Sequence, residues 1–395
     1  MKTHSLSKKA LKRDSIVAEA INQINERGIS FLSLNSVAMS MGLSRNTLYY
    51  YFKNREDLIY SCYLLAAEAT AEDLQTAALS EKPGAAQIFH FVSSNLERKS
   101  AAIGDLTQLS PKHRSVIHDL KRKNEQMLQA MIQRGIEQEQ FRNVSPVIAT
   151  QVLMSFVSWH QLSGRWFNTP KTDPRKDATA EKISDMLLYG ICRNPDFKFR
   201  YQINFQVLQA PEFNAFNTDS LNEEKRRQLI GQAAQLFNQR GIDAVSLEDI
   251  ARFIGTSKGA VYHYFKDKPS LIRACYESAF KQYDQIIEAA IALCPSDLEA
   301  LLSVNHLNCQ AQSSRFPPLI LQPGEAVFYD DYHSEVSRLA EKIQELRRRC
   351  FRNKSLRDIS EESIELSSGA HSWISQWLGE NSSEVDQWDS IALSN

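Results

Sequence analysis

The chain has 395 residues, 43% of them hydrophobic and 24% charged, and a formal net charge of −1 at pH 7. This composition is typical of a globular protein with room for two cores, and the near-neutral balance excludes a protein coated in nucleic acid. Lys and Arg nevertheless gather locally: residues 1–60 hold nine against five acidic residues, and residues 222–272 hold eight against six. Such local patches favour contact with phosphates over a small part of the surface.

The chain offers no export, membrane or metal signal. No apolar signal-peptide core follows the first methionine, and the least polar run, residues 147–162, is too short and too polar to span a bilayer. We therefore expect a cytoplasmic protein without metal or cofactor, in which Cys62 and Cys275 are small buried residues. Three further candidates for metal ligands lack paired spacing and are expected to pack: Cys294, His306 and Cys309.

In chain order, residues 13–52 predict three short helices. The first has helically spaced apolar residues and ends at Gly28, a frequent helix stop. Ser33 is placed to cap the second helix, although Ser33-Leu-Asn-Ser36 lacks the acid of a full capping box, which predicts a weaker start. Gly42 ends the second helix and Ser44 caps the third. The result is a helix-turn-helix inside a three-helix unit.

The same pattern returns 213 residues later. Residues 13–66 align without a gap to residues 226–279, with 20 of 54 positions identical. The period is too long for a solenoid, so the repeat indicates a duplicated domain. In the second copy Ser246-Leu-Glu-Asp249 does resemble a capping box. The regions after the two blocks, roughly 55–192 and 268–395, also read as helices.

One segment predicts a strand instead. From Phe197 to Val207 apolar and polar residues alternate without error, a period of two. A lone strand is not stable, so we expect this segment to lie as an extended strap on a helical domain or to pair with another strand.

The third helix of each block carries the chemistry. Leu48 and Phe52 share one face and should pack inward, which leaves Arg45 at the exposed N-terminal end. A cation there opposes the helix dipole, so stability does not explain it, whereas in a major groove it could bond guanine O6 and N7. Tyrosine hydroxyls, the capping serines and the following lysines could reach the flanking phosphates. The alternative without a ligand is that these polar residues form an ordinary solvent-exposed helix face.

These blocks resemble the DNA-binding domain of TetR-family transcriptional regulators. The residues that carry the likeness are Gly-Leu-Ser-Arg-Asn-Thr-Leu-Tyr-Tyr-Tyr-Phe-Lys from position 42 and Gly-Thr-Ser-Lys-Gly-Ala-Val-Tyr-His-Tyr-Phe-Lys from position 255. The resemblance implies an all-α fold of two tandem units, each with a helix-turn-helix head and a helical C-terminal domain for effector binding and dimerisation. The implied domains are a first head at 1–58, a first regulatory domain at 59–195, an extended linker at 196–221, a second head at 222–271 and a second regulatory domain at 272–395.

The resemblance also implies which residues would touch DNA. Base reading falls on Arg45, Asn46, Tyr49, Lys258, Gly259 and Tyr262. Phosphate contacts fall on Ser33, Ser44, Tyr50, Tyr51, Lys53, Ser246, Ser257, His263, Tyr264 and Lys266. The family commonly has Gly where this chain has Asn46, which forgoes close backbone approach but could read adenine.

Two alternatives compete with DNA binding. Residues 255–259 satisfy the G-x-S-x-G pattern of a hydrolase, but that motif needs a preceding strand and here a helix is predicted, so we expect no enzyme. A second alternative is a ligand-binding or scaffold protein of TetR fold whose heads no longer bind DNA. The exposed cations at positions 45 and 258 argue against it.

Two heads in one chain predict an intramolecular pseudo-dimer on a double-stranded DNA operator with unlike half-sites, because the base-facing residues diverge. The rival is a dimer of chains with four heads. A repressor released by an unknown small-molecule effector is the expected role, with no membrane partner. The aromatic candidates for the effector pocket are Phe89, Trp159, His160, Trp166, Phe328, His371, Trp373 and Trp377.

Overall fold

A computed structural model describes residues 2–79, 84–98, 100–101, 106–166, 176–194, 197–200, 203–208, 218–242, 245–320 and 326–358. Within these residues the regular structure is helical, and they contain one isolated antiparallel β-bridge, between Cys192 and Leu356. The predicted all-α fold is confirmed. No helix in this part of the chain is long and apolar enough to cross a bilayer.

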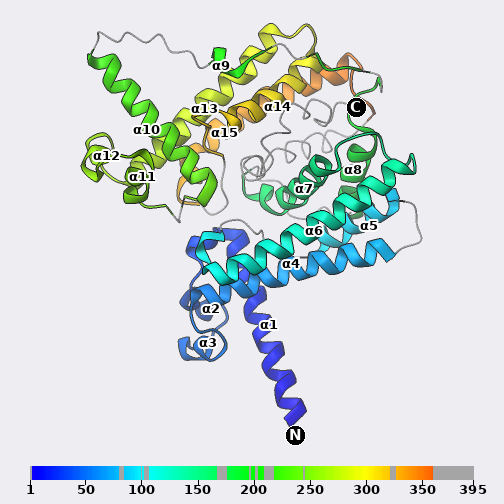
Figure 1. Ribbon diagram of the computed structural model, residues 1–395, viewed down its shortest axis with the longest axis vertical. Coiled ribbons are helices and arrows are strands. Elements are labelled where there is room, and N and C mark those ends of the chain that lie inside the picture. Colours follow the sequence, from blue (N-terminus) through cyan, green and yellow to red (C-terminus); the bar gives the residue numbers. More distant parts are fainter. Residues whose placement is uncertain are drawn as a thin grey trace. The chain divides into compact units, whose positions relative to one another are not determined.

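The first half begins with a three-helix head and continues into longer helices (Figure 1). Its elements are α1 (Lys2–Arg27), η1 (Ile29–Phe31), α2 (Leu34–Ser40), α3 (Arg45–Tyr51), α4 (Arg55–Leu79), α5 (Gly84–Glu97), η2 (Leu106–Gln108), α6 (Pro111–Glu137), α7 (Pro146–Trp166) and α8 (Lys176–Tyr189). Helix α1 starts eleven residues earlier than predicted, at Lys2 rather than Arg13.

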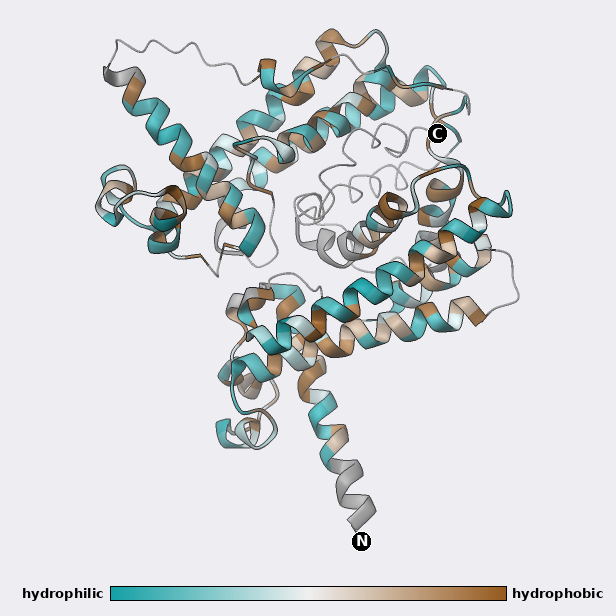
Figure 2. Cartoon of the chain, viewed as in Figure 1, coloured by the Kyte–Doolittle hydropathy of each residue, from teal (hydrophilic) through white to brown (hydrophobic). Residues whose placement is uncertain are grey.

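The second half repeats this order after a short connecting helix. Its elements are α9 (Phe205–Leu208), α10 (Thr218–Arg240), α11 (Leu247–Ile254), α12 (Lys258–Tyr264), α13 (Lys268–Leu293), α14 (Asp297–Ser313) and α15 (Ala326–Arg352). Helices α10–α12 form the second head. The long helices carry hydrophobic and hydrophilic residues along the same length, as amphipathic helices do (Figure 2).

The chain divides into two compact units, each described here by itself. The first contains head one (α1–α3) and the bundle of α4, α5 and α6. The second contains head two (α10–α12) with α13, α14 and α15, and it also includes residues 142–156 and 185–208 of the first half. The boundaries of the five predicted domains therefore stay a proposal.

Each head has its own apolar core. In head one Ile16 and Ala20 of α1 are buried against Leu48 of α3 and Leu58 of α4. Cys62 and Cys275 are buried in the two copies, where each thiol points at a carbonyl of the first helix: Val17 O at 3.9 Å and Ile230 O at 3.6 Å. The same packing is thus built twice.

A repeated asparagine ties each head to the loop that precedes the last bundle helix. In the first half Asn25 Nδ2 donates to Ser100 O at 2.8 Å. In the second half the buried Asn238 donates to Pro318 O at 2.9 Å and accepts from the Ile320 amide at 3.0 Å. Both asparagines stand near the end of the first helix of a head, so they connect the head to the bundle behind it.

The duplication continues to the end of the bundles. Helices α6 and α15 are both 27 residues long. Each ends in a turn with a positive-φ residue, Glu139 at 56° and Lys354 at 58°. The backbone hydrogen bonds of the two turns also correspond, for example Gln140 N to Gly135 O and Ser355 N to Cys350 O. These residues are 215 positions apart, two more than in the heads.

The predicted strand at residues 197–207 is wrong over its described part. Residues 197–200 and 203–204 are irregular, and α9 begins at Phe205. Phe205 is buried, its amide donates to Gln310 Oε1 at 2.9 Å, and the Phe199 ring lies 6.1 Å from that of His306. Phe199 and Phe205 thus lie against α14, and α9 contacts both α13 and α14, as the strap alternative anticipated, whereas Val207 is exposed.

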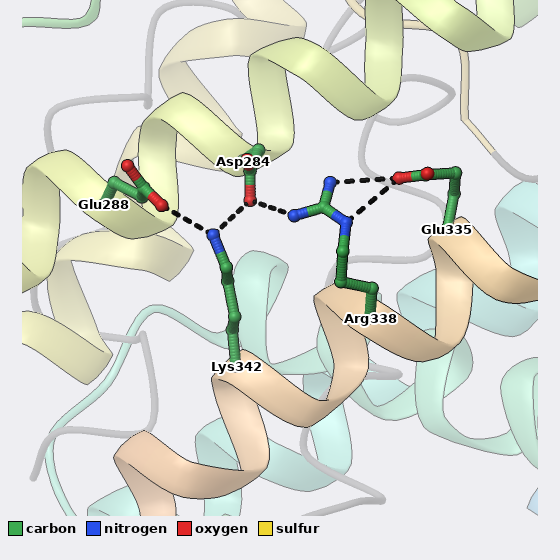
Figure 3. Close-up of polar contacts among 5 residues, drawn as sticks. All are labelled: Asp284, Glu288, Glu335, Arg338 and Lys342. Atoms are coloured by element: carbon green, nitrogen blue, oxygen red, sulfur yellow. Dashed lines mark hydrogen bonds and ion pairs between the residues drawn. The ribbon is translucent and has the colours of Figure 1, made fainter.

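Ion pairs join α13 and α15 in the second bundle (Figure 3). Lys342 lies between Asp284 at 2.7 Å and Glu288 at 2.6 Å, and Arg338 contacts Asp284 at 2.9 Å and Glu335 at 3.0 Å. The hydrogen bonds from Lys342 and Arg338 lower the pKa of Asp284 despite its partial burial. This network bridges the two helices on their exposed side.

Candidate nucleic-acid interface

The third helix of each head is positioned by the same turn. In head one the φ of Gly42 is +62°, and the Leu43 amide returns to Ala38 O at 2.8 Å. In head two the φ of Gly255 is +74°, and the Thr256 amide returns to Ala251 O at 2.9 Å. Glycine favours this left-handed conformation, so both copies turn sharply between their second and third helices.

Both helices begin at the predicted serine caps. Ser44 Oγ accepts from the Thr47 amide at 3.1 Å, and Ser257 Oγ accepts from the Ala260 amide at 3.2 Å. The second helices are capped by Ser33 and Ser246, each in a complete capping box. The weaker start predicted in the first copy is therefore wrong, because the Ser36 hydroxyl accepts from the Ser33 amide at 3.0 Å in place of a carboxylate.

The inward faces are fixed by packing. Leu48, Phe52, Val261 and Phe265 are all buried. The guanidinium of Arg13 lies 5.1 Å from the Phe52 ring, and that of Arg226 lies 5.3 Å from the Phe265 ring. With their inward residues held in the same way, the recognition helices α3 and α12 present the same positions to solvent.

The six predicted base-reading residues lie on these outward faces and are all exposed. The Arg45 guanidinium bonds Tyr49 OH at 3.2 Å and lies 5.4 Å from that ring. Lys258 Nζ is also 5.4 Å from the ring of Tyr262, four residues on. The cation and the tyrosine thus form a pair in both copies, at helical i, i+4 spacing.

The fold does not require the two heads to have different residues at positions 46 and 259. A β-carbon built at Gly259 would meet only the Ser257 hydroxyl, at 3.8 Å. The corresponding Asn46 is exposed in head one. Packing within the heads therefore does not restrict the side chain at positions 46 and 259, and a bound ligand is a better explanation of the difference between them.

The predicted phosphate contacts divide into exposed and half-buried residues. Ser44, Tyr50, Lys53, Ser257, His263 and Lys266 are exposed, whereas Ser33, Tyr51, Ser246 and Tyr264 are partly buried. The rings of Tyr50 and Tyr51 meet edge-on at 5.1 Å, and those of His263 and Tyr264 meet edge-on at 4.9 Å. The two heads therefore hold their aromatic pairs in the same geometry.

Lys9 is a candidate that the sequence prediction missed. Its Nζ lies 4.4 Å from the ring of Tyr50, on the outward face of α3. This contact arises because α1 extends to Lys2. Residues 2–12 contain no Gly or Pro, which was the available signal that the helix continues.

Head two carries a carboxylate where head one has none. Glu248, near the start of α11, forms an ion pair with Lys258. Its pKa is lowered, chiefly by the hydrogen bond from Lys258, and the pKa of Lys258 is raised chiefly by the same hydrogen bond. The corresponding residue in head one is Asn35.

Head one is joined to its bundle by a polar cluster around Arg55 and Glu56, the Arg55–Glu56 cluster. Arg55 donates to the carbonyls of η1 and its C-cap, Ile29 O at 2.5 Å and Leu32 O at 2.7 Å, and to Gln108 Oε1 at 2.7 Å. Head and η2 are thereby joined through one guanidinium.

Glu56 completes the cluster at the start of α6. Its carboxylate accepts from the Ser110 amide at 2.8 Å and lies 2.8 Å from His113 Nδ1. The His113 ring stacks on Tyr60 at 3.9 Å. The hydrogen bond from the Ser110 backbone amide is the main cause of the lowered pKa of Glu56. Position 269, the counterpart of Glu56, is a proline that cannot repeat these contacts.

The effector-pocket residues stay predictions. Phe89 is half-buried on α5. The side chains of Trp159, His160 and Trp166 on α7, and of Phe328 on α15, lie outside the described residues. So do His371, Trp373 and Trp377.

The residues that resembled a hydrolase motif or a metal site in the sequence have other roles in the structure. Residues 255–259 follow helix α11 rather than a strand, so they do not form a nucleophile elbow. The Cys294 thiol donates to Ser303 Oγ at 3.1 Å, and His306 bonds Gln310 at 2.8 Å. No group of three metal-binding side chains occurs among the residues described.

Comparison with known proteins adds independent evidence. HTH-type transcriptional regulator TtgR of Pseudomonas putida is 34% identical over 68 residues, 17% of this chain and 32% of that protein. HTH-type transcriptional repressor KstR2 of Mycolicibacterium smegmatis is 30% identical over 114 residues, 28% of this chain and 54% of that protein. The chain thus aligns with 32% and 54% of the length of these two relatives.

A solved TetR family transcriptional regulator, PfmR from Thermus thermophilus, is 26% identical over 46% of this chain and 98% of that one, with a TM-score of 0.38. The family model for bacterial regulatory proteins of the tetR family matches residues 16–62 and again residues 229–275. The model for the tetracyclin repressor-like C-terminal domain matches residues 85–191. Since both heads and the first bundle match, this chain belongs to the TetR family and contains two tandem TetR-like units.

Proposed function

We propose that this protein is a sequence-specific DNA-binding transcriptional regulator that uses both heads. The observation that carries the proposal is the duplicated outward face of α3 and α12. Each presents an exposed cation on its first turn and an exposed tyrosine four residues later, held by buried residues on the opposite side. A cation at a helix N-terminus is not stabilised by the dipole, so its recurrence favours a ligand that needs it.

Selection from random DNA tests this proposal. We expect the purified chain to enrich a defined sequence, and the double variant Arg45→Ala, Lys258→Ala to lose most of that binding. Each good base contact is worth about 1–3 kcal/mol, so two losses should weaken binding by at least about 30-fold. The variant Glu335→Gln, which alters a partly exposed residue of α15, is the control. A double variant that binds normally would refute the site assignment.

We further infer that the operator is asymmetric. Two of the three predicted base-reading positions differ between the heads, Arg45 against Lys258 and Asn46 against Gly259, and the third is tyrosine in both. Unlike side chains read unlike base edges. A selected consensus with two different half-sites supports this inference, and a symmetric one contradicts it.

The two halves are proposed to act as one pseudo-dimer. Within the second unit, the end of the first half pairs with the end of α15: Arg193 N donates to Ser355 O at 3.0 Å, and Arg357 N donates to Ile191 O at 2.9 Å. Arg357 also forms an ion pair with Asp185. These contacts join sequence from both halves, and covalent linkage keeps the partner at high local concentration. Light scattering that gives one chain per particle supports the pseudo-dimer, and two chains support the four-headed rival.

Release of DNA by a small-molecule effector is the last element of the proposal. Its support is the Arg55–Glu56 cluster, which links head one to both η2 and α6 through specific hydrogen bonds. Rearrangement of the bundle would change these bonds and so bias the position of the head. Glu56→Gln with His113→Ala should leave DNA binding intact but reduce its response to an effector found by screening. If the effector changes the DNA affinity of this variant as much as that of the wild type, the Arg55–Glu56 cluster does not transmit effector binding to the head.

A further inference from the structure

The two heads differ in how their cations are paired. In head two the recognition-helix cation Lys258 forms an ion pair with Glu248 of α11, and both side chains are about half exposed, at 52% and 47%. In head one Arg45 bonds the hydroxyl of Tyr49, and among the described residues no carboxylate lies within ion-pair distance of it. Asn35 occupies the position of Glu248.

The first helices of the heads show the same difference. In head one Lys9 lies against Tyr50 of the recognition helix. The counterpart of Lys9 in head two is Asn222. Two cations of α10 are paired with carboxylates of their own helix: Arg226 with Glu223 at 3.5 Å, and Arg227 with Glu224 at 2.8 Å. Among the described residues Lys9 and Arg45 of head one form no ion pair with a carboxylate, whereas Arg226, Arg227 and Lys258 of head two do.

We infer that Glu248 competes with DNA for Lys258, which makes head two the weaker DNA-binding head and head one the anchor. This inference rests on the proposed function. For Lys258 to reach a base edge or a phosphate, its contact with Glu248 must break, and the released carboxylate then faces a polyanion. Because binding strength follows the number of cations that replace counterions on DNA, an internally paired lysine contributes less than a free one.

The asymmetry gives the protein a specificity device. Head one can bind DNA through Lys9 and Arg45 without first breaking an ion pair. Head two adds affinity only where its half-site makes enough contacts to displace Glu248 from Lys258. The carboxylate thus raises the penalty for an incorrect second half-site, a repulsive element of the kind that specificity requires.

Exchanging the residues at this position tests the inference. Glu248→Gln removes the competing charge and keeps the side-chain shape, and Asn35→Glu places a carboxylate in head one. The probe is a labelled duplex selected from random DNA by the wild-type chain, with fluorescence anisotropy measuring its binding over a series of KCl concentrations. Glu335→Gln, which changes the same charge on α15, is the matched control, and circular dichroism confirms that each variant is folded.

We expect Glu248→Gln to bind about 3- to 10-fold more tightly at low salt and to steepen the plot of log affinity against log salt by about one unit, as for one more phosphate contact. Asn35→Glu should bind about 3- to 10-fold more weakly, and Glu335→Gln should match the wild type. The gain in Glu248→Gln should be largest on duplexes with a scrambled second half-site.

The inference is overturned if Glu248→Gln binds no more tightly than the wild type. It is also overturned if this variant loses binding only where one base is present, because Glu248 would then be a direct base reader. Failure of the inference alone leaves a wild type that binds its selected duplex and a double variant, Arg45→Ala with Lys258→Ala, that does not. Failure of the proposed function is different, because the wild type would then enrich no sequence at all.

Discussion

Replacement of Asn238 by alanine should destabilise the second head by about 2–4 kcal/mol. Asn238 is 5% exposed, donates to Pro318 O at 2.9 Å and accepts from the Ile320 amide at 3.0 Å. Alanine removes these bonds and a third, from Asn238 to Gln312 Oε1 at 3.3 Å, and leaves the partly buried Ile320 amide without this partner. A hydrogen bond contributes about 1 kcal/mol, and an unpaired buried group costs about 1–3 kcal/mol more, which gives about 2–4 kcal/mol.

Asn25 holds the corresponding place in the first half, where it is half-buried and donates to Ser100 O at 2.8 Å. Urea unfolding of the full chain, followed by circular dichroism, measures the stability of Asn238→Ala, and amide hydrogen exchange at Ile320 locates the effect. A loss well below about 1 kcal/mol, or unchanged exchange at Ile320, would refute the assignment of Asn238 as a connection between the second head and the helices behind it.

Three further predictions concern single residues. Gly255→Ala should destabilise the second head by about 1 kcal/mol because the φ of Gly255 is +74°. Gly259→Ala, inside α12, should instead stabilise that head by up to about 1 kcal/mol and change its DNA preference. Thermal unfolding measures the stability of both variants. Burial raises the pKa of Asp73 even though Arg98 lies 2.7 Å from its carboxylate. The stability contributed by the protonated carboxyl is therefore full below the unfolded pKa of about 3.9 and is lost as pH rises through the folded value. Asp73→Asn, which keeps a neutral side chain, should gain stability relative to the wild type as pH rises toward 7. Lys342→Met should cost less than about 1 kcal/mol in low salt, because the ion pairs of Lys342 with Asp284 and Glu288 are partly exposed, and the loss should shrink in about 1 M NaCl.

Each of these predictions has an outcome that would contradict it. Equal melting temperatures for Gly255→Ala and Gly259→Ala would mean that backbone conformation is not decisive at position 255. A stability difference for Asp73→Asn that grows toward acidic pH would reverse the sign of the argument. A salt-independent loss in Lys342→Met would indicate packing of its aliphatic stem rather than charge.

The heads could be predicted from sequence because their signals are local. Gly42, Ser44 and Leu48 define a turn, a cap and a buried face within seven residues, and the repeat at Gly255, Ser257 and Val261 supplied an independent check. Each of these features depends on neighbours within one or two helical turns, and packing in the folded head agrees with them.

The features that sequence missed depend on contacts between distant residues. The period of two at residues 197–207 was real, but Phe199 and Phe205 lie against α14 rather than another strand, and Val207 is exposed. Ser36 serves in a capping box through its hydroxyl, a role usually expected of Glu or Gln. The ion pair of Glu248 with Lys258 joins two helices of the head and is visible only once both are folded.

The matching turns at Glu139 and Lys354 bear on the history of the chain. They lie beyond the heads, at the far ends of bundles that share little sequence, yet their hydrogen bonds correspond residue by residue. The ancestral segment that was copied therefore reached past the DNA-binding domain to include at least six helices. The spacing of matching residues changes from 213 in the heads to 215 at these turns, so a net two residues were gained or lost between positions 66 and 134 of the first half, and the fold tolerates this change in length.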